Sequence, residues 1–567
     1  MKDLLLRSHG GALVNLYETI KENEKLFKNT LPYLPRLVLN ERQICDLELI
    51  MNGGFSPLSG FLNEDEYVSV ITKMRLPNGI LWPIPIVLDV HGKDVYSVGG
   101  DVLLCDTFDN PLAVIRVESI YKSDKEKEAK AVYGTKSQDH FGVNYLYGRV
   151  NEYCLGGKIY ALHKIEHLDY PDLRLTPAEL QAWFFKKNWK HIIGFQTRNP
   201  IHKAHFSLIK DAAKNVGGKV LIHPSVGLTK DGDIDAVTRI KCYQIIQDKY
   251  AKDFSKLNLL PLAMRMAGPK EALLHAIIRK NYGCTHFIIG RNHADPGNNR
   301  QGIPFYKPYE AQELACQFAK EIGIEILCYK EMVYEEKSKK YVSVDNIKKT
   351  DRVKKISGTD FRKMLFMNEK IPGWFSFPEI IKFLRINAKY NRGLTVFFTG
   401  LPSSGKSTLS RSLGAYIMNT YHRKVTLLDG DIVRKNLSKG LGFSKEDRKT
   451  NIRRIGFVAS EITKHGGIAL CAAISPYKDA RKEVRDIVSV NGVYVEVYVS
   501  TPLELCKERD IKGLYKKMKV GLIKGVTGVD DAYERPINPE ITVNTSGKTI
   551  KQSLRFITAY LEKRKLL

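Results

Sequence analysis

Long apolar runs are absent from this sequence of 567 residues. No stretch approaches the ~18 consecutive apolar residues of a membrane-spanning helix. The segment from Met1 to Gly11 holds only the short run Leu4-Leu-Leu6, with Arg7 and His9 close behind, which is too short for the core of a secretory signal. We therefore expect no membrane span, no secretory signal and no membrane partner.

Clustered cysteines are missing as well. The nine cysteines are scattered between Cys45 and Cys506, without a CxxC pair and without the Cys/His spacing of a zinc site. Scattered cysteines are typical of reduced thiols, so we expect a cytoplasmic protein.

Acidic residues are fewer than basic ones. The chain has 62 Asp and Glu and 89 Lys and Arg, which gives a formal net charge of +27. This charge predicts anionic partners, either nucleic acid or smaller anions such as nucleotides, sulfate and pyrophosphate. No signature of an RNA- or DNA-binding fold accompanies this charge. Much of it comes from lysines spread along the chain, as in segments 122–130 and 337–340, and this distribution is typical of a solvated surface. Nucleic-acid binding is therefore the least favoured class of function, and we expect no nucleic-acid partner.

The length of the chain predicts several domains, because 567 residues exceed what one hydrophobic core usually supports. Short β-like runs between turns predict a β-rich domain, whereas apolar strands that alternate with helices predict a parallel α/β sheet. The strands expected in the first such sheet are 192–195, 220–223, 286–289 and 324–327. The predicted fold class is thus multidomain α/β, with a β-rich domain at 1–170, a parallel α/β domain at 171–329, a small subdomain at 330–390 with a polar linker at 387–393, and a second α/β domain at 391–567.

A phosphate-binding loop opens the last domain. Gly400-Leu-Pro-Ser-Ser-Gly-Lys-Ser-Thr408 satisfies GxxxxGK[ST] between a strand-like segment, 394–399, and a helical one, 409–418, which is the context that the pattern requires. Its backbone N–H groups wrap a phosphate chain, Lys406 reaches the β- and γ-phosphates, and Ser407 can bind Mg²⁺. The loop residues expected to contact nucleotide are Gly400, Ser404, Gly405, Ser407 and Thr408.

Two acidic residues, Asp429 and Asp431, follow the strand-like segment 425–428. In an open α/β sheet, ligands bind at the carboxyl ends of the strands. One carboxylate could accept a proton from an attacking hydroxyl while the other orders the metal shell, and a simple capped turn is the alternative.

The last domain resembles the adenosine 5′-phosphosulfate (APS) kinases. The resemblance is carried, in order and spacing, by Asp429-Gly-Asp-Ile-Val-Arg434, Leu441-Gly-Phe443, Arg448, Asn451-Ile-Arg-Arg454, Ile474-Ser-Pro-Tyr477 and Lys512-Gly-Leu-Tyr-Lys516. It implies a P-loop kinase that transfers the γ-phosphoryl group of MgATP to the 3′-hydroxyl of APS. It also implies that APS is held by Asp429, Arg434, Arg448, Asn451 and Lys512, that Phe443 stacks on adenine, and that Ser475 matches a serine able to carry a phosphate.

One position departs from that family. The kinases usually have Phe where this chain has Val526. Because stacking of a base on an aromatic ring is worth roughly 1–3 kcal/mol, the missing ring predicts weaker binding of APS without loss of the chemistry.

A second constellation, Gln196-Thr-Arg-Asn-Pro-Ile-His-Lys-Ala-His205, follows the predicted strand 192–195. Pro200 is well placed to begin a helix capped by Asn199, so that His202 and His205 would share one helical face. Two imidazoles and Arg198 beside a helix N-terminus could bind a polyphosphate and a second, small anion. They could also be metal ligands, although no carboxylate or cysteine joins them locally.

The surrounding sequence resembles the ATP sulfurylases over nearly all of residues 1–390. The matching segments are 53–61, 81–86, 196–205, 226–233, 264–268, 275–282, 290–294 and 356–359. The resemblance implies a PUA-like N-terminal domain and a Rossmann-like nucleotidylyltransferase domain. The implied reaction is attack of sulfate on the α-phosphorus of ATP, which forms APS and releases pyrophosphate.

The same resemblance implies a role for each residue of the site. Gln196, Arg198 and Ala294 would contact sulfate, whereas Thr197, Asn199, His202, His205, Gly290, Arg291, Asn292, His293 and Val333 would contact ATP. Arg198 is expected to stabilise the transition state together with Mg²⁺. Asn292 and Asp295 stand where the family usually has Asp and Gly, so an altered affinity for sulfate is expected.

The sequence therefore predicts a two-headed sulfate-activating enzyme, sulfurylase first and APS kinase second. The alternative is an ATP sulfurylase whose kinase-like C-terminal domain is inactive and regulatory. Lys406, Ser407 and Asp429 favour the first interpretation, because a module that only regulates has no need of them. Both families usually assemble, so a homo-oligomer is expected.

Overall fold

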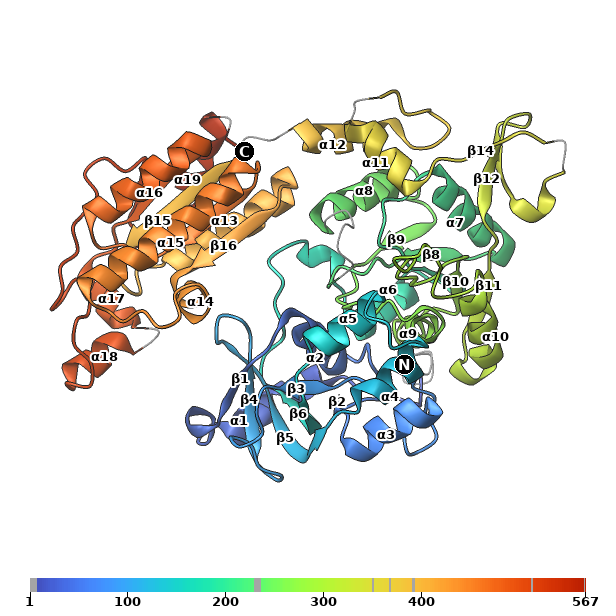
Figure 1. Ribbon diagram of the computed structural model, residues 1–567, viewed down its shortest axis with the longest axis horizontal. Helices are drawn as coiled ribbons and strands as arrows, with labels where there is room; N and C mark the ends of the chain where they lie inside the picture. The colour runs from blue at the N-terminus through green and yellow to red at the C-terminus, as the bar shows by residue number, and fades with distance from the viewer. Residues whose placement is uncertain are drawn as a thin grey trace. The chain divides into compact units, whose positions relative to one another are not determined.

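The computed structural model describes residues 8–228, 236–348, 351–366, 369–389, 393–510, 513–564 and 566–567 (Figure 1). Its residues form two compact units. The first unit comprises Met1–His167 and Pro171–Ile381, and the second comprises Leu168–Tyr170 and Lys382–Leu567. None of the helices in these described ranges combines the length and the apolar character needed to cross a membrane.

The first unit begins with a mixed six-stranded sheet, blue in Figure 1. Its strands are β1 (Arg36–Val38), β4 (Asp101–Cys105), β5 (Pro111–Lys122), β6 (Tyr153–Ala161) and β2 (Gly60–Phe61) in that spatial order, with β3 (Leu88–Val90) also paired to β6. The accompanying helices are α1 (Ile20–Phe27), α2 (Glu41–Met51), α3 (Glu64–Lys73), α4 (Lys125–Tyr133) and α5 (Phe141–Gly148). The predicted β-rich start is therefore confirmed.

A parallel five-stranded sheet follows, green in Figure 1. Its spatial order is β11 (Glu325–Cys328), β10 (His286–Ile289), β7 (Ile192–Phe195), β8 (Lys219–Ile222) and β9 (Ser255–Leu257). The strands β7 and β10 have the predicted bounds, and β8 and β11 each differ from the prediction by one residue. The strand β9 was not predicted, because its 3 residues give too short an apolar pattern.

Five helices connect these strands, namely α6 (Pro177–Lys186), α7 (Lys203–Val216), α8 (Ala236–Lys249), α9 (Gly268–Asn281) and α10 (Glu310–Ile322). The helix α9 is buried on nearly every side, at 12 of its 14 residues. Its Ile277 belongs to the same hydrophobic core as Leu47 of α2 and Phe287 of β10. The β-rich domain and the parallel sheet therefore share one core, with α9 inside it.

A small antiparallel sheet completes the first unit. Its order is β13 (Lys340–Ser343), β12 (Met332–Glu335) and β14 (Val353–Lys354), and helices α11 (Gly358–Phe366) and α12 (Pro378–Lys389) follow. Because α12 reaches Lys389, residues 387–389 of the predicted linker are helical. Residues 390–392 of that linker lie outside the described residues.

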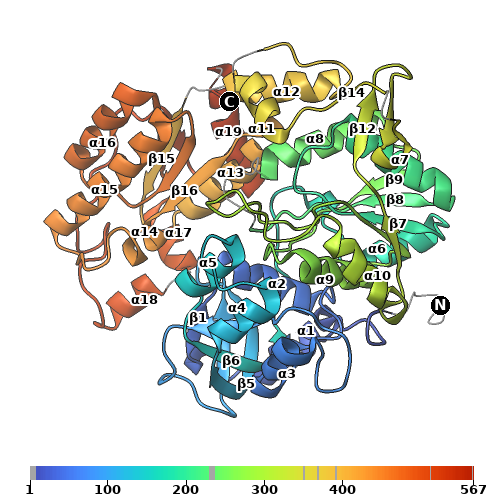
Figure 2. The ribbon, with the colours of Figure 1, turned by 45° about the vertical axis from the view of Figure 1, so that its right-hand side comes forward.

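The second unit is a five-stranded parallel sheet with helices on both faces, orange to red in Figure 2. The strand order is β16 (Val425–Asp429), β17 (Ile468–Ala472), β15 (Leu394–Gly400), β18 (Val493–Val499) and β19 (Ile541–Val543). Its helices are α13 (Lys406–Tyr421), α14 (Gly430–Lys435), α15 (Lys445–Lys464), α16 (Lys478–Asn491), α17 (Leu503–Arg509), α18 (Leu514–Lys519) and α19 (Ile550–Lys563).

The two faces of this sheet have separate hydrophobic cores. Val396 and Phe398 of β15 pack with residues of α13 and α19, whereas Phe397 packs with residues of α15 and α16. Because neighbouring side chains of a strand point to opposite faces, a strand with helices on both sides must be apolar throughout. That requirement explains why all seven residues of β15 are buried.

Candidate active sites

The first candidate site lies where two adjacent strands of the first unit end. The strand β7 leads to the loop 196–199 and β10 leads to the loop 290–294, and these two strands pair in parallel. The loops therefore meet at one edge of the sheet, and Arg198 Nη2 donates to the backbone oxygen of Asp295 at 3.2 Å. The structure thus brings together the residues that the sequence predicted in both loops.

The backbone of the first loop is held from α8. The buried Arg239 donates through Nη1 to the backbone oxygen of Arg198 at 3.2 Å, and the Tyr243 hydroxyl donates to that of Asn199 at 3.0 Å. The Thr197 hydroxyl donates to the same Asn199 oxygen at 2.9 Å. The loop is therefore fixed through its carbonyl oxygens.

The helix after this loop begins later than predicted. It starts at Lys203 with His202 as its N-cap residue, so the predicted start at Pro200 with Asn199 as cap is wrong. The reason is tertiary, because Lys203 N donates to the backbone oxygen of Phe375 at 3.1 Å, and a segment distant in sequence therefore satisfies this amide of the first turn.

The two histidines are neutral at pH 7. Burial, followed by the neighbouring His205, lowers the pKa of His202 to about 3, and burial lowers the pKa of His205 as well. The ring of His202 bonds through Nδ1 to the Ser376 hydroxyl at 2.8 Å and contacts the rings of Phe361 and Phe375. Nδ1 of His205 is buried without a hydrogen-bond partner within the described residues, and such a group is expected to gain one from a ligand or water.

The second loop combines open backbone with anchored side chains. A Cβ built on Gly290 would meet no atom within 4 Å, and Arg291 forms an ion pair of 2.9 Å with Glu331. Asn292 is exposed, and Ala294 has a left-handed backbone with φ of 53°. The loop therefore presents backbone groups at the end of β10 with little steric obstruction.

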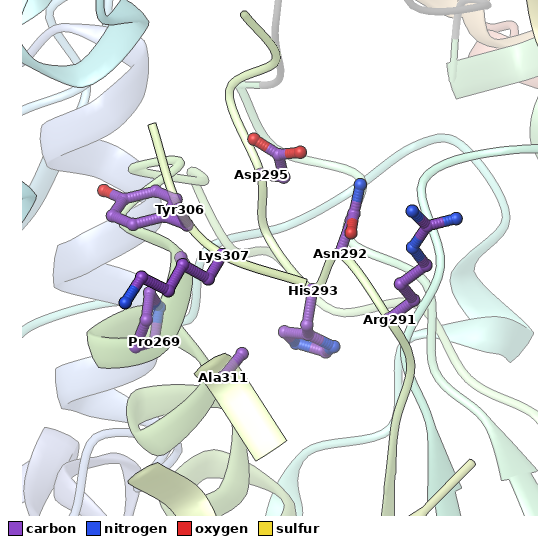
Figure 3. A pocket seen from close by; sticks show the side chains of 9 residues that line it. Pro269, Arg291, Asn292, His293, Asp295, Tyr306, Lys307 and Ala311 are labelled. Carbon is purple, nitrogen blue, oxygen red and sulfur yellow. The ribbon is translucent and has the colours of Figure 1, made fainter. Parts of the chain in front are cut away.

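The departure at Asp295 has a local explanation. Its Oδ1 accepts a hydrogen bond from the backbone N–H of Gly297 at 2.9 Å, so part of its negative charge is directed at its own loop. Figure 3 shows Asp295 above a small pocket that His293 and Lys307 also line. Val333 lies elsewhere, on β12, which packs against α7, and it is 1% exposed.

The second candidate site lies at the carboxyl end of β15. Gly400 has φ of 152°, and a Cβ there would approach the backbone oxygen of Val499 to 2.5 Å. The loop passes into α13 at Lys406, after Gly405 with φ of 104°. The backbone oxygen of Ser404 accepts from the Thr501 hydroxyl at 2.9 Å, while Thr408 is exposed.

Acidic and hydroxyl groups converge beside this loop. The Ser407 hydroxyl donates to Oδ2 of Asp429 at 2.6 Å, and Oδ1 of Asp429 accepts from the backbone N–H of Asp431 at 3.0 Å. Asp429 is thus the N-cap of α14 as well, so the capped turn of the alternative interpretation occurs, and the same carboxylate also contacts the P-loop. Lys406 Nζ donates to the backbone oxygen of Leu401 at 2.7 Å.

Two arginines and a phenylalanine that were predicted for the second site lie close together. The guanidinium of Arg434 lies 4.4 Å from the ring centre of Phe443 and that of Arg448 lies 5.8 Å from it, and Phe443 is 69% exposed. Oδ1 of Asn451 and Oγ of Ser475 are buried without a hydrogen-bond partner in the described part of the chain. Lys512, also predicted here, lies outside the described residues.

Comparison with known proteins follows this division of the chain. Residues 6–164 match the PUA-like domain, 171–387 match ATP-sulfurylase, and 392–544 match adenylylsulphate kinase. The chain is 45% identical to the sulfate adenylyltransferase of Phaeosphaeria nodorum over 566 residues, which cover 99% of each chain. It is 45% identical to that of Aspergillus oryzae over 561 residues, 98% of each chain.

The chain belongs to the sulfate adenylyltransferase family. A solved structure described as the hexameric APS kinase from Thiobacillus denitrificans is 31% identical, with a TM-score of 0.57 and coverage of 100% of this chain and 99% of that one. The order of the matches confirms the predicted fold class and the predicted pairing of a sulfate adenylyltransferase with an APS kinase.

Several residues for which the sequence predicts no role surround the adenylyltransferase site. Arg279 of α9 is fully buried, and its Nη2 donates to Oε1 of Gln196 and, at 2.9 Å, to the backbone oxygen of His223. Nε2 of Gln196 donates to the Ser225 hydroxyl at 2.8 Å. A Cβ on Gly194 of β7 would lie 2.8 Å from Cγ of Arg279, so a glycine is needed there. Only the folded chain reveals these contacts, since α9 is remote from β7 in sequence.

The β-rich domain also contributes a side chain to the surroundings of the adenylyltransferase site. Asp46 of α2 accepts from Arg265 Nη2 with both carboxylate oxygens at 2.6 Å, and both side chains are buried. The pairing neutralises one guanidinium, whereas burial lowers the pKa of Arg279 to about 9.

Val526, which departs from the kinase pattern, lies in a hydrophobic cluster. Its side chain is 6% exposed and packs with Cys506 and Tyr515, against which the P-loop residue Leu401 also packs. The side chain is therefore directed into the interior of the second unit.

Proposed function

We propose that this chain activates sulfate in two steps. The first unit converts ATP and sulfate into APS and pyrophosphate, and the second unit converts APS and a second ATP into 3′-phosphoadenosine 5′-phosphosulfate and ADP. The two phosphate-binding loops, each at the carboxyl end of parallel strands, support this assignment.

In the first step, an anion must approach a more highly charged anion. We assign Arg198 to the transition state and Gln196 and Ala294 to sulfate. The neutral His202 and His205 would bind the ATP polyphosphate through ring N–H groups, together with Thr197, Asn199, Val333 and the loop Gly290–His293. Support comes from the contact between Arg198 and the second loop and from the unpartnered Nδ1 of His205.

In the second step, Lys406 and the loop Gly400–Thr408 would bind ATP, and Asp429 would accept the proton of the 3′-hydroxyl of APS. Asp431 would lie at the same edge. Arg434, Arg448, Asn451 and Lys512 would hold APS, and Phe443 would stack on its adenine. The exposed Phe443 between two arginines and the unpartnered oxygen of Asn451 support the APS site. Ser475 remains a candidate for carrying a phosphate.

Mg²⁺ is the metal that we propose with both ATP molecules. Within the described ranges, no group of three or more His, Cys, Asp or Glu side chains is arranged to hold a metal ion. Mg²⁺ fits nevertheless, because it is usually bound by one or two protein groups, water and substrate phosphates. Ser407, with Asp429 next to it, would hold it in the kinase, where it would neutralise charge on the phosphates.

One observation carries the proposal of an active kinase. The hydrogen bond of 2.6 Å between Ser407 and Asp429 brings together, beside Lys406, the hydroxyl and the carboxylate that we propose for Mg²⁺ and for the proton of APS. The second candidate is an ATP sulfurylase with an inactive, regulatory kinase-like domain. It is favoured by the names of the fungal relatives, which mention only the adenylyltransferase over the full length.

Product analysis separates these two functions. The chain is incubated with ATP, Mg²⁺, radioactive sulfate and pyrophosphatase, and the labelled nucleotides are resolved. We expect APS followed by 3′-phosphoadenosine 5′-phosphosulfate. APS alone would support the regulatory domain, and the absence of both would refute the proposal.

We also propose that the chain forms a homo-oligomer in the cytoplasm. The likeness to a chain described as a hexameric APS kinase supports self-association. Light scattering coupled to size-exclusion chromatography gives the mass directly, and a mass near the 64.4 kDa of one chain would refute it.

A further inference from the structure

Three charged or titratable residues form a stripe along α9. Glu271, His275 and Arg279 follow each other at intervals of four residues and therefore lie on one face of the helix. All three are 0% exposed. Titratable residues are rarely buried in this way unless they are paired, so the stripe calls for a reason beyond packing.

The stripe continues by polar contacts to the second loop of the adenylyltransferase site. Glu271 accepts from the backbone N–H groups of Arg265 at 2.9 Å and Ala267 at 2.8 Å. Its Oε1 lies 3.4 Å from Nε2 of His275, and Nδ1 of His275 lies 2.8 Å from Nε2 of His293. The chain Glu271–His275–His293 thus leads from the start of α9 to the phosphate site.

The chemistry of these groups fixes where the protons lie. Burial opposes ionisation of Glu271, but its hydrogen bonds and the nearby His275 outweigh burial, so the pKa of Glu271 is lowered and it is a carboxylate at pH 7. Burial lowers the pKa of His275, which is therefore neutral. Nε2 of His275 makes no hydrogen bond within the described residues, but it lies 3.4 Å from the carboxylate, which favours a proton over a lone pair on that nitrogen, so Nδ1 is the nitrogen that accepts. His293 must then donate through Nε2, which leaves Nδ1 as the nitrogen available to a ligand.

We propose that Glu271 and His275 are positioning residues for the adenylyltransferase reaction, which orient His293 and allow it to take up one proton when a polyphosphate binds. The inference rests on the proposed function of the first unit. In the protonated ring, Nε2–H still donates to His275, and the added proton on Nδ1 is donated to a phosphate oxygen. The proton comes from solvent, and no covalent bond between heavy atoms changes.

The charges around His293 explain why the uptake follows binding. Burial, then His275, Arg279 and Arg198, hold the pKa of His293 well below its usual value. Arg291, Asp295 and Lys307 line the same pocket (Figure 3). A polyphosphate brings several negative charges among these cations and favours the protonated ring, while Glu271 supplies a compensating negative charge from behind.

The first test compares the pH dependence of APS synthesis in variants of the chain. If protonated His293 serves the bound substrate, activity falls as pH rises through its pKa in the complex. Glu271→Gln removes the compensating charge and should move that alkaline limb to lower pH by ~1 unit. His275→Asn keeps an acceptor for Nε2–H of His293 but breaks the link to Glu271, so the same direction is expected in a protein that retains its packing.

A matched control is available on β10. His286 Nε2 lies 3.1 Å from Oε2 of Glu325, and burial lowers the pKa of His286, but this pair is at the start of the strand rather than at the site. His286→Asn should leave the alkaline limb in place. Superimposable profiles for wild type, Glu271→Gln and His275→Asn would overturn the proposal, as would an equal shift in His286→Asn.

The second test measures the proton directly. Inorganic pyrophosphate, a product of the first step only, is titrated with Mg²⁺ into the full chain at pH 7, in buffers of different ionisation enthalpy. Wild type should take up more protons than His275→Asn, because the lower pKa of His293 in the variant leaves part of that ring neutral in the complex. Equal proton uptake would refute the proposal even if the pH profiles were ambiguous. A wild type that makes no APS would refute the proposed function, and this inference with it, whereas normal APS synthesis with unshifted profiles would refute the inference alone.

Discussion

The two candidate sites lie at the same place in their sheets, the carboxyl ends of parallel strands, but they obtain positive charge in different ways. In the first unit, charge comes from side chains, namely Arg198, the buried Arg239 and Arg279 of the same site, and histidines that are neutral before a ligand arrives. In the second unit, the backbone of the loop Gly400–Thr408 and the start of α13 supply the N–H groups, with Lys406 added.

This difference agrees with the two reactions. Backbone N–H groups are sufficient for transfer of a terminal phosphoryl group to a hydroxyl, because Mg²⁺ and a lysine neutralise most of the negative charge of the phosphates. Attack of sulfate on the α-phosphorus brings an additional dianion into the site, which requires further cations that are already in place. The first site is therefore expected to depend more strongly on single side chains, and the second more strongly on loop conformation.

The largest effect is expected for Arg198→Ala. APS synthesis should fall by roughly 10²–10³-fold, because one preorganised donor to the transition state is lost. Phosphorylation of externally supplied APS should change less than about twofold. Arg198→Lys, which keeps the charge but loses the planar fork, should recover only part of the activity. Normal APS synthesis by Arg198→Ala would remove this residue from the mechanism.

Lys406→Ala tests the kinase activity of the second unit. Kinase activity should fall by roughly a hundredfold, by analogy with the loss of one preorganised donor, while the rate of APS synthesis stays near that of wild type. The measurement is a coupled assay for ADP with APS as substrate. If 3′-phosphoadenosine 5′-phosphosulfate still accumulates at the wild-type rate, the P-loop is not the kinase site and the regulatory interpretation gains support.

Mixing these two variants tests whether the heads are chemically independent. Because APS can diffuse between molecules, an equimolar mixture of Arg198→Ala and Lys406→Ala should form the final product from sulfate at about half the wild-type rate or less. A mixture without activity, although each variant retains its remaining head, would mean that APS is transferred within one assembly.

Acid should weaken the first unit before the second. The pKa of folded His202 is about 3, below the ordinary value of 6.5, so the unfolded chain binds more protons between these values. Stability is therefore fully present above pH 6.5 and declines as pH falls through that window. The predicted residues of the second site include no histidine. Thermal unfolding at pH 7 and pH 5 should show the larger decrease for the transition that also abolishes APS synthesis.

The smallest effect is expected at Val526. Since its side chain lies in the cluster with Cys506 and Tyr515, Val526→Phe should overpack that cluster and reduce stability by ~1–3 kcal/mol. The KM for APS should not decrease, in contrast to what the family pattern alone suggests. Val526→Ile is the matched control with a smaller added volume. A lower KM for APS with unchanged thermal stability would show that the ring reaches the base.

Most of the strand pattern could be predicted from the sequence. Each strand is a short apolar run, often followed directly by a motif, and such a pattern is a local feature of the chain. The bounds of β7 and β10 and the context of the P-loop illustrate this. The start of α7 could not be predicted, since a backbone oxygen of Phe375, distant in sequence, satisfies the amide of Lys203. The helical residues 387–389 were mistaken for linker because polar composition does not distinguish an exposed helix end from a connection.

The sequence by itself determined the two phosphate-binding motifs and their order, because the spaced glycines and the lysine of one motif and the histidines of the other each lie within about ten neighbouring residues. Only the tertiary structure decided which remote groups complete them. Arg279 reaches Gln196, and Glu271 reaches His293 through His275, because α9 is buried beside the sheet. The physical reason is that burial and hydrogen-bond partners set the charge and orientation of a side chain, and both depend on contacts between segments far apart in the chain.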